Sequence, residues 1–223
     1  LFPVYNSDSI WLQKIKDVDE IKLFNETQQV FGDFIKETLE IEDLFKHIKY
    51  YNTSFKAPKV ITLVTNLDYE SKVIYADSLL FVALDMYLGK SDEVYADFPQ
   101  YLSQNFEKSR LLVDVANEIG TRFYQPKPLR QFISSIISEG KKVYLLDSFL
   151  PIMNDETKIG YLASELNWAN DNEEQIWKYF IDNKLLFSTD SKLNSRFINN
   201  APFSKFYMDL DKESPGRIGV WLG

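Results

Sequence analysis

The chain has 223 residues, of which 45% are hydrophobic and 26% charged, so its composition is that of a globular protein able to bury a core. It contains one histidine, His47, and no cysteine, which excludes two-histidine zinc sites, mixed histidine–cysteine zinc sites and cysteine–histidine dyads within one chain. The net charge of −8 disfavours nucleic acid as a partner and electrostatic attachment to an anionic membrane.

The N-terminal part is predicted to be helical over about residues 11–51. Apolar residues recur there at steps of three and four, as in Val30, Phe31, Phe34 and Ile35. Gly32 and the acidic stretch 40–43 weaken the pattern, so two or three helices are expected.

A small antiparallel sheet of about three strands is predicted over about residues 59–84. The segments 60–65, 73–75 and 79–84 are short and rich in β-branched or aromatic residues. Because they follow one another closely in the chain, antiparallel pairing is expected. The continuous apolar run at 79–84 indicates a strand that is covered on both faces.

The C-terminal part is predicted to be helical over about residues 100–223. One apolar stripe comprises Leu112, Val115, Ala116 and Ile119, and a second begins at Phe132. The fold class is therefore α+β, mostly α, as a single domain over residues 1–223.

The motifs of common enzymes are missing from the sequence. There is no Gly-x-Ser-x-Gly elbow and no glycine-rich phosphate loop. His47 is interpreted as a residue of a helix surface. Paired carboxylates suffice for glycoside hydrolysis, and the chain has 33 acidic residues, but no pair among them is distinguished by its context.

Aromatic residues and one arginine are candidate binding residues. Trp168 and Trp177 belong to a ring-rich stretch that would either line a sugar or peptide groove or pack in the core. Arg217 follows a Ser-Pro-Gly turn and would either bind an anion at a helix start or lie exposed on the turn.

Several long stretches resemble the gliding-motility lipoprotein B family of Bacteroidetes, namely residues 77–90, 173–180, 201–206 and 214–223. Together with residues 147–151 and 159–161, the resemblance covers most of residues 56–223. The resemblance implies a periplasm-facing lipoprotein of the cell envelope whose partners are envelope proteins of the gliding apparatus. It also implies a membrane attachment only through an N-terminal lipid, on a cysteine preceding Leu1 that is absent from this chain.

That family is also distantly similar to predicted zinc metallopeptidases, in which strands precede a His-Glu-x-x-His helix and a helix with a Glu-Gly pair. Here Ser138-Glu139-Gly140 resembles the latter, whereas the helix at 111–119 has no histidine. Asp114 and Glu118 have the ligand spacing, but they point away from the apolar stripe and are expected to form a solvated surface pair. The resemblance thus implies a degenerate zincin-like fold whose ligands are lost.

The preferred interpretation is a non-catalytic binding or scaffold protein, a pseudoenzyme with no catalytic, cofactor-binding or metal-binding residue and no cofactor. Glu139, Trp168, Trp177 and Arg217 remain the candidate site residues. The alternative is a carboxylate-based hydrolase, either a glycan-acting enzyme or a metal-dependent peptidase with unusual ligands. A third possibility is a ligand-binding module that uses the two tryptophans.

Overall fold

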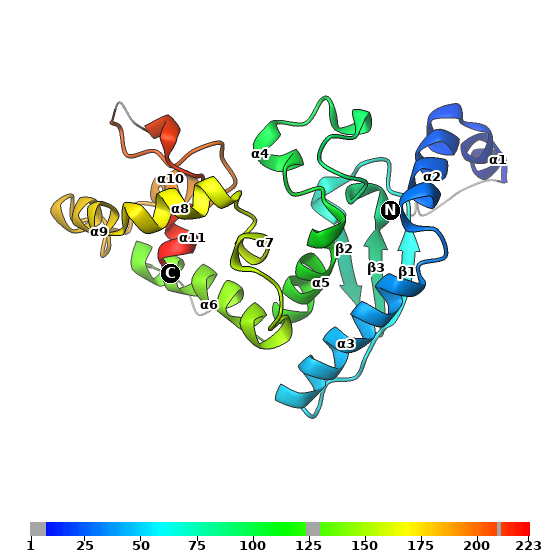
Figure 1. Cartoon of the computed structure of the whole chain (residues 1–223), viewed down its shortest axis with the longest axis horizontal. Helices are drawn as coiled ribbons and strands as arrows, with labels where there is room; N and C mark the ends of the chain where they lie inside the picture. The colour runs from blue at the N-terminus through cyan, green and yellow to red at the C-terminus, as the bar shows by residue number, and fades with distance from the viewer. Residues whose placement is uncertain (1–7, 124–129, 209–210) are drawn as a thin grey trace. The chain divides into compact units, whose positions relative to one another are not determined.

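The computed structural model describes residues 8–123, 130–208 and 211–223 (Figure 1). The chain divides into two compact units, unit 1 with Leu1–Phe98 and Phe106–Glu118, and unit 2 with Pro99–Asn105 and Ile119–Gly223. The single domain expected from the sequence stays a prediction.

Unit 1 begins with three helices, α1 (Asp8–Lys16), α2 (Val18–Phe31) and α3 (Ile35–Tyr51), which confirms the expected number. The carboxylate of Asp17 caps α2 by accepting the backbone N–H groups of its first turn. Gly32 ends α2 with a φ of 56°, a value that favours glycine. The acidic stretch 40–43 does not interrupt α3, because glutamate is a good helix former and its exposed side chains stay solvated.

The sheet has three strands, β1 (Lys59–Leu63), β2 (Val73–Ala76) and β3 (Leu79–Ala83), close to the predicted segments. Their order is β1-β3-β2, with β2 antiparallel and β1 parallel to β3. The prediction of an antiparallel sheet is therefore wrong for one of the two pairs. The connection at 64–72 places β2 one strand position away from β1, and the tight turn after β2 returns the chain as β3 into the position between them. β3 therefore runs antiparallel to β2 and parallel to β1.

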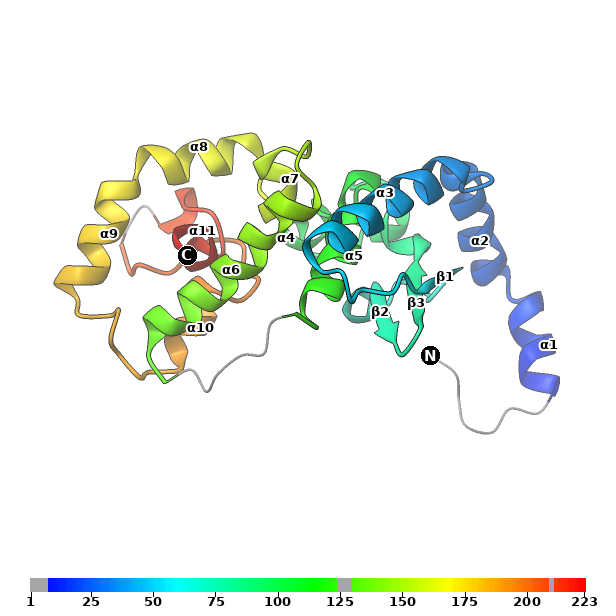
Figure 2. The same ribbon diagram turned by 90° about the horizontal axis from the view of Figure 1, so that it is seen from below.

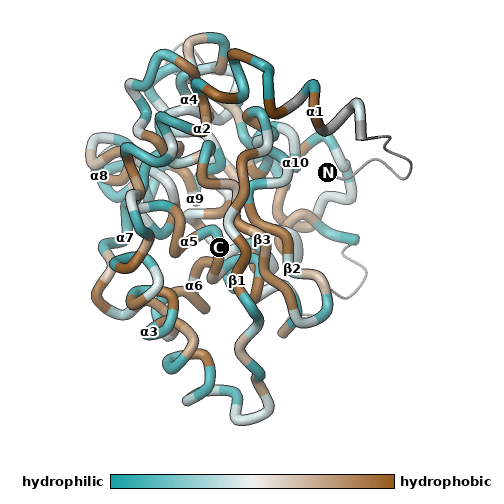
Figure 3. Tube along the Cα trace, turned by 90° about the vertical axis from the view of Figure 1, so that its right-hand side faces the viewer, coloured by the Kyte–Doolittle hydropathy of each residue, from teal (hydrophilic) through white to brown (hydrophobic). Residues whose placement is uncertain are grey.

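The core of unit 1 lies around β3 and α5 (Leu111–Gly120), and Figure 1 shows α5 beside the sheet. Leu80 and Val82 are fully buried in the central strand, and hydrophobic residues run along all three strands in Figure 3. In α5, Val113 is as completely buried as Val115. This helix is therefore covered on most of its circumference instead of on one stripe.

Short 3-10 turns complete unit 1: η1 (Tyr69–Ser71), η2 (Leu84–Met86), η3 (Glu93–Tyr95) and η4 (Lys108–Arg110). Edge-to-face contacts join the rings of Tyr95, Phe98 and Phe106. The hydroxyl of Tyr95 donates to the backbone oxygen of Asp85 at 2.6 Å. These aromatic contacts fix the irregular segment to the end of β3.

Unit 2 is helical in its described residues. Its elements are α4 (Gln100–Ser103), α6 (Phe132–Phe149), α7 (Asp155–Ile159), α8 (Ala163–Asp171), α9 (Glu173–Asp182), α10 (Lys192–Phe197), η5 (Asp211–Glu213) and α11 (Ile218–Leu222). Figure 2 shows α11 surrounded by α6, α8 and α10. A cluster of rings fills the core, formed by Phe132, Phe180, Phe197 and Phe206.

The predicted fold class, α+β and mostly α, is confirmed by these elements. No helix in the described ranges combines the length and the apolarity that crossing a bilayer requires.

Candidate functional site

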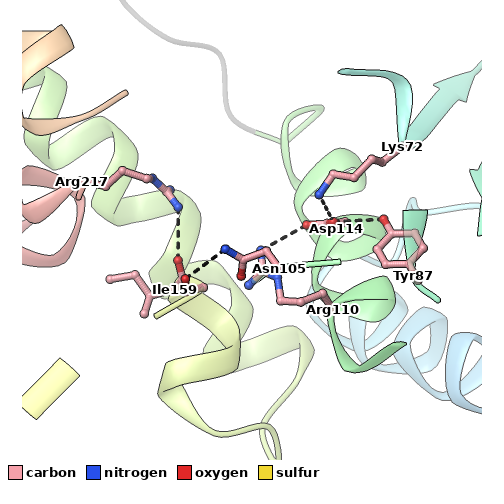
Figure 4. Close-up of polar contacts among 8 residues, drawn as sticks. Lys72, Tyr87, Asn105, Arg110, Asp114, Ile159 and Arg217 are labelled. Carbon is pink, nitrogen blue, oxygen red and sulfur yellow. Dashed lines mark hydrogen bonds and ion pairs between the residues drawn. The ribbon is translucent and has the colours of Figure 1, made fainter. Parts of the chain in front are cut away.

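Asp114 on α5 is the centre of a polar cluster in unit 1 (Figure 4). Its carboxylate lies 2.5 Å from the ammonium of Lys72, just before β2, and 3.2 Å from the guanidinium of Arg110. The hydroxyl of Tyr87 donates to the same carboxylate at 3.0 Å. Two cations and one phenol thus converge on one carboxylate whose side chain is only 13% exposed.

The cluster holds its groups in fixed protonation states. Burial alone would raise the pKa of Asp114, but Lys72 and Arg110 outweigh it and lower that pKa below its ordinary value. Burial, helped by the adjacent charge of Asp114, raises the pKa of Tyr87 well above its ordinary value. Asp114 is therefore an ionised acceptor and Tyr87 a neutral donor at neutral pH.

The expectation that Asp114 and Glu118 form a solvated surface pair is wrong. Both residues are half-buried. Asp114 is enclosed by its ion-pair partners, and Glu118 accepts the backbone N–H of Tyr75 at 3.2 Å. Tyr75 lies on β2, an edge strand of the sheet. Since α5 packs against that edge, its polar residues face polar groups of the sheet instead of water.

A second buried carboxylate stabilises the chain that leaves β1. Asp85 is fully buried and accepts the backbone N–H groups of Thr65 and Leu67 at 3.0 and 2.8 Å. Burial raises its pKa, while the hydrogen bonds from Leu67 and Thr65 oppose the rise. These contacts explain Asp85 as a residue that fixes a loop.

Glu139, the acid of the Ser-Glu-Gly triplet, lies on α6 in unit 2. Its carboxylate is 2.6 Å from the ammonium of Lys142, and its side chain is 29% exposed. The neighbouring Gly140 packs against the backbone of Gly223, which directly follows α11, and an added Cβ would lie 2.0 Å from its carbonyl carbon. Among the described residues, no group of three histidine, aspartate or glutamate side chains lies close enough to hold a metal ion.

The C-terminal stretch that carries the resemblance forms a buried network of hydrogen bonds. The hydroxyl of Ser204 donates to Pro215 at 2.7 Å and accepts the N–H of Ile218 at 3.1 Å. The hydroxyl of Tyr161 donates to the carbonyl of Gly216 at 2.7 Å. This network ties together the start of α11, the segment before η5 and the end of α7.

Arg217 directly precedes α11 with a left-handed φ of 57°. Its guanidinium donates to the carbonyl of Ile159 at 3.2 Å, and Asn105 donates to the next carbonyl, that of Gly160, at the same distance (Figure 4). The arginine therefore supports the end of α7. It is half-buried, unlike the exposed turn residue that the sequence offered as an alternative.

The two tryptophans lie in different environments. Trp168, on α8, is half-buried against the core of unit 2. Trp177, on α9, exposes 37% of its surface, and Ile181 one turn later exposes 59%. The indole of Trp177 is therefore the more accessible of the two.

Sequence reasoning did not identify Lys72, Tyr87 and Arg110 as neighbours of Asp114. The spacing of Arg110 and Asp114, four residues apart, was a visible signal of a helical ion pair. Lys72 and Tyr87 are distant in the sequence, and only the packing of the sheet against α5 brings them to the carboxylate.

The comparisons with known proteins agree with the resemblance noted in the sequence. The model of the family described as gliding motility protein GldB matches residues 1–223. No curated protein and no solved structure matches the chain. The chain therefore belongs to the gliding motility protein GldB family, which connects it with gliding motility.

Proposed function

We propose that this protein is a non-catalytic component of the gliding machinery, which acts by binding or supporting envelope proteins instead of by turning over a substrate. Membership of the gliding motility protein GldB family supports the biological setting. The partners of such a component would be other envelope proteins of the gliding apparatus.

The observation that carries this proposal is that the carboxylates an enzyme would need for catalysis are already bound to other groups of the protein. Asp114 is neutralised by Lys72 and Arg110, and Glu139 is paired with Lys142. Glu118 accepts a backbone N–H of the sheet. A general acid or base needs a proton that exchanges with substrate, and a metal ligand needs free lone pairs. These contacts give the three carboxylates a structural role.

We also propose that the protein descends from a zincin-like metallopeptidase and has lost its metal ligands. The order of elements supports it, since a sheet is followed by α5 and then by α6 with its Glu139-Gly140 pair. In α5 the two ligand positions would be Asp114 and Glu118, four residues apart. Asp114 now forms ion pairs with Lys72 and Arg110, and Glu118 accepts a backbone hydrogen bond from the sheet.

The proposed location is the cell envelope, facing the periplasm, with an N-terminal lipid as the membrane anchor. The family description and the resemblance in sequence support this location. The net charge of −8 also supports a covalent anchor, because an acidic protein is not attracted to an anionic lipid surface.

Metal affinity of the purified chain tests the proposal against its main alternative, a metal-dependent peptidase. The chain is dialysed with one equivalent of zinc, and in parallel with calcium, and the retained metal is measured. The proposal expects substoichiometric retention that is unchanged by Glu139→Gln. Stoichiometric zinc that is lost in Glu139→Gln would refute the proposal and establish a metal site.

A positive test concerns the partners. An affinity-tagged full-length chain is isolated from envelope membranes after mild cross-linking. The proposal expects other envelope components of the gliding machinery at amounts comparable to the chain. Cleavage of glycan or peptide substrates by the isolated chain, lost in Glu139→Gln, would instead support the carboxylate-based hydrolase.

A further inference from the structure

Unit 2 contains a cavity of about 330 Å³ that the proposed function does not use. Its wall on α6 is a single helix face, because Gly140, Val143, Tyr144 and Asp147 recur at steps of three and four. The volume lies at the lower end of the range for small-ligand sites. The other walls come from α7, α8 and α11 and include Asp155, Lys158, Leu166 and Trp221.

The polar end of the cavity is formed around a buried lysine. The side chain of Lys158 is 7% exposed, and its ammonium lies 2.7 Å from Asp147 and 3.5 Å from Asp155. The two carboxylates remain 52% and 79% exposed. Since two carboxylates face one ammonium, this end of the cavity carries one net negative charge.

The rest of the lining is apolar or aromatic. Aliphatic side chains form part of the wall, among them Val143 and Leu166, and the half-buried ring of Trp221 adds an aromatic surface. Tyr144, 75% exposed, stands at the rim. A lining of this kind favours an apolar stem, and rings near carboxylates favour a cationic head.

We propose that this cavity binds a primary amine carried on an aliphatic stem. The ammonium would donate to the exposed oxygens of Asp147 and Asp155, and the stem would contact the apolar wall. An anionic ligand would instead face two carboxylates and be repelled. The same chemistry is supplied by a free small amine or by a lysine side chain of another polypeptide.

The test titrates the full chain with n-hexylamine and follows backbone and indole NMR signals. The proposal expects shifts confined to lining residues such as Gly140 and Trp221. n-Hexanol and hexanoate have a similar stem without the cation, and both should bind at least about tenfold more weakly. Equal binding of all three compounds, or no shifts at the lining residues, would overturn the proposal.

Variants that remove the charge of Asp147 or Asp155 test whether these carboxylates bind the amine. Asp155→Asn lies at an exposed position, so it should preserve the fold and weaken amine binding about threefold, as expected for a solvent-exposed ion pair. Asp147→Asn with Asp155→Asn should weaken it about tenfold. Asp171→Asn, an exposed acid of α8 outside the cavity, is the matched control and should leave the affinity unchanged. Unchanged affinity in the double variant would overturn the role of the carboxylates.

Two further probes distinguish the sources of the amine. A blocked tripeptide with a central lysine is compared with its norleucine analogue and with free n-hexylamine. If the lysine peptide binds and the norleucine peptide does not, the cavity receives a side chain of a partner. If only the free amine binds, the ligand is a small molecule. Each result supports the proposed chemistry.

Discussion

The ammonium of Lys72 lies 2.5 Å from the carboxylate of Asp114, although the two residues are 42 positions apart in the chain. Lys72 directly precedes β2, and Asp114 lies on α5, so the ion pair joins the sheet to the helix that covers it. Arg110 contacts the other oxygen of the same carboxylate. The sheet and α5 are therefore held together by a buried-edge ion pair in which one carboxylate is shared by two cations.

Removal of the Asp114 charge is expected to destabilise the protein. In Asp114→Asn the partly buried cations of Lys72 and Arg110 lose their counter-charge, so the free energy of unfolding should fall by about 2 to 4 kcal/mol. Urea denaturation of wild type and variant measures the difference. Asp43→Asn, an exposed acid on α3, is the control and should change stability by less than about 0.5 kcal/mol. A similarly small change in Asp114→Asn would contradict the account of the cluster.

The same pair predicts a pH dependence. Because the pKa of Asp114 is lower in the folded protein than its ordinary value of 3.8, its stabilising contribution is present above that value. The contribution is lost as the pH falls through the lowered pKa. The stability difference between wild type and Asp114→Asn should therefore be constant near neutral pH and shrink in acid below about pH 4. A difference that stays constant down to pH 2 would disagree with the lowered pKa.

Gly140→Ala is expected to destabilise unit 2 although alanine is the better helix former. In the interior of α6 the exchange would ordinarily stabilise by about 1 kcal/mol. The new Cβ, however, would lie 2.0 Å from the backbone of Gly223, so the backbone at the end of α11 must shift, at a cost of about 1 to 3 kcal/mol or more. Thermal unfolding should show a lower midpoint, whereas Lys141→Ala at the next, exposed position should leave it nearly unchanged. A raised midpoint in Gly140→Ala would show that the two helices do not approach this closely.

Ser204→Ala is expected to loosen the start of α11. The change removes a buried hydroxyl that donates to Pro215 and accepts from Ile218, leaving both backbone groups without this partner, at about 2 to 3 kcal/mol. Hydrogen exchange should become faster at residues 214–220. Ser195→Ala, at an exposed position on α10, provides the comparison and should not alter exchange there. Unchanged protection in Ser204→Ala would argue against the network.

The elements of the fold could be predicted from local sequence patterns, while the pairing between them could not. The strands near 60, 74 and 81 follow from β-branched runs, and Gly32 marks the end of a helix. The direction of β1 relative to β3 depends on the path of the intervening connection, which hydrophobic periodicity does not record. That direction was predicted wrongly.

The contacts of the candidate site, like the strand pairing, could not be predicted from local sequence patterns. Periodicity assigns α5 one apolar stripe and so places Asp114 in solvent, but Val113 on another face is buried as well. A helix enclosed on several sides buries its polar residues, which then require partners from distant segments. Lys72 and Tyr87 supply them for Asp114. These are contacts between elements that single-sequence patterns do not reveal.

The most direct test of the central claim is the gliding speed of cells in which the chain carries Glu139→Gln, measured at a protein level equal to wild type. Under the proposed function, Glu139 is the ion-pair partner of Lys142 and not a reacting group, so these cells should glide at wild-type speed, as should Lys142→Gln cells. Cells that stop gliding with Glu139→Gln at normal protein level, while Lys142→Gln cells still move, would contradict the account and indicate chemistry at that carboxylate.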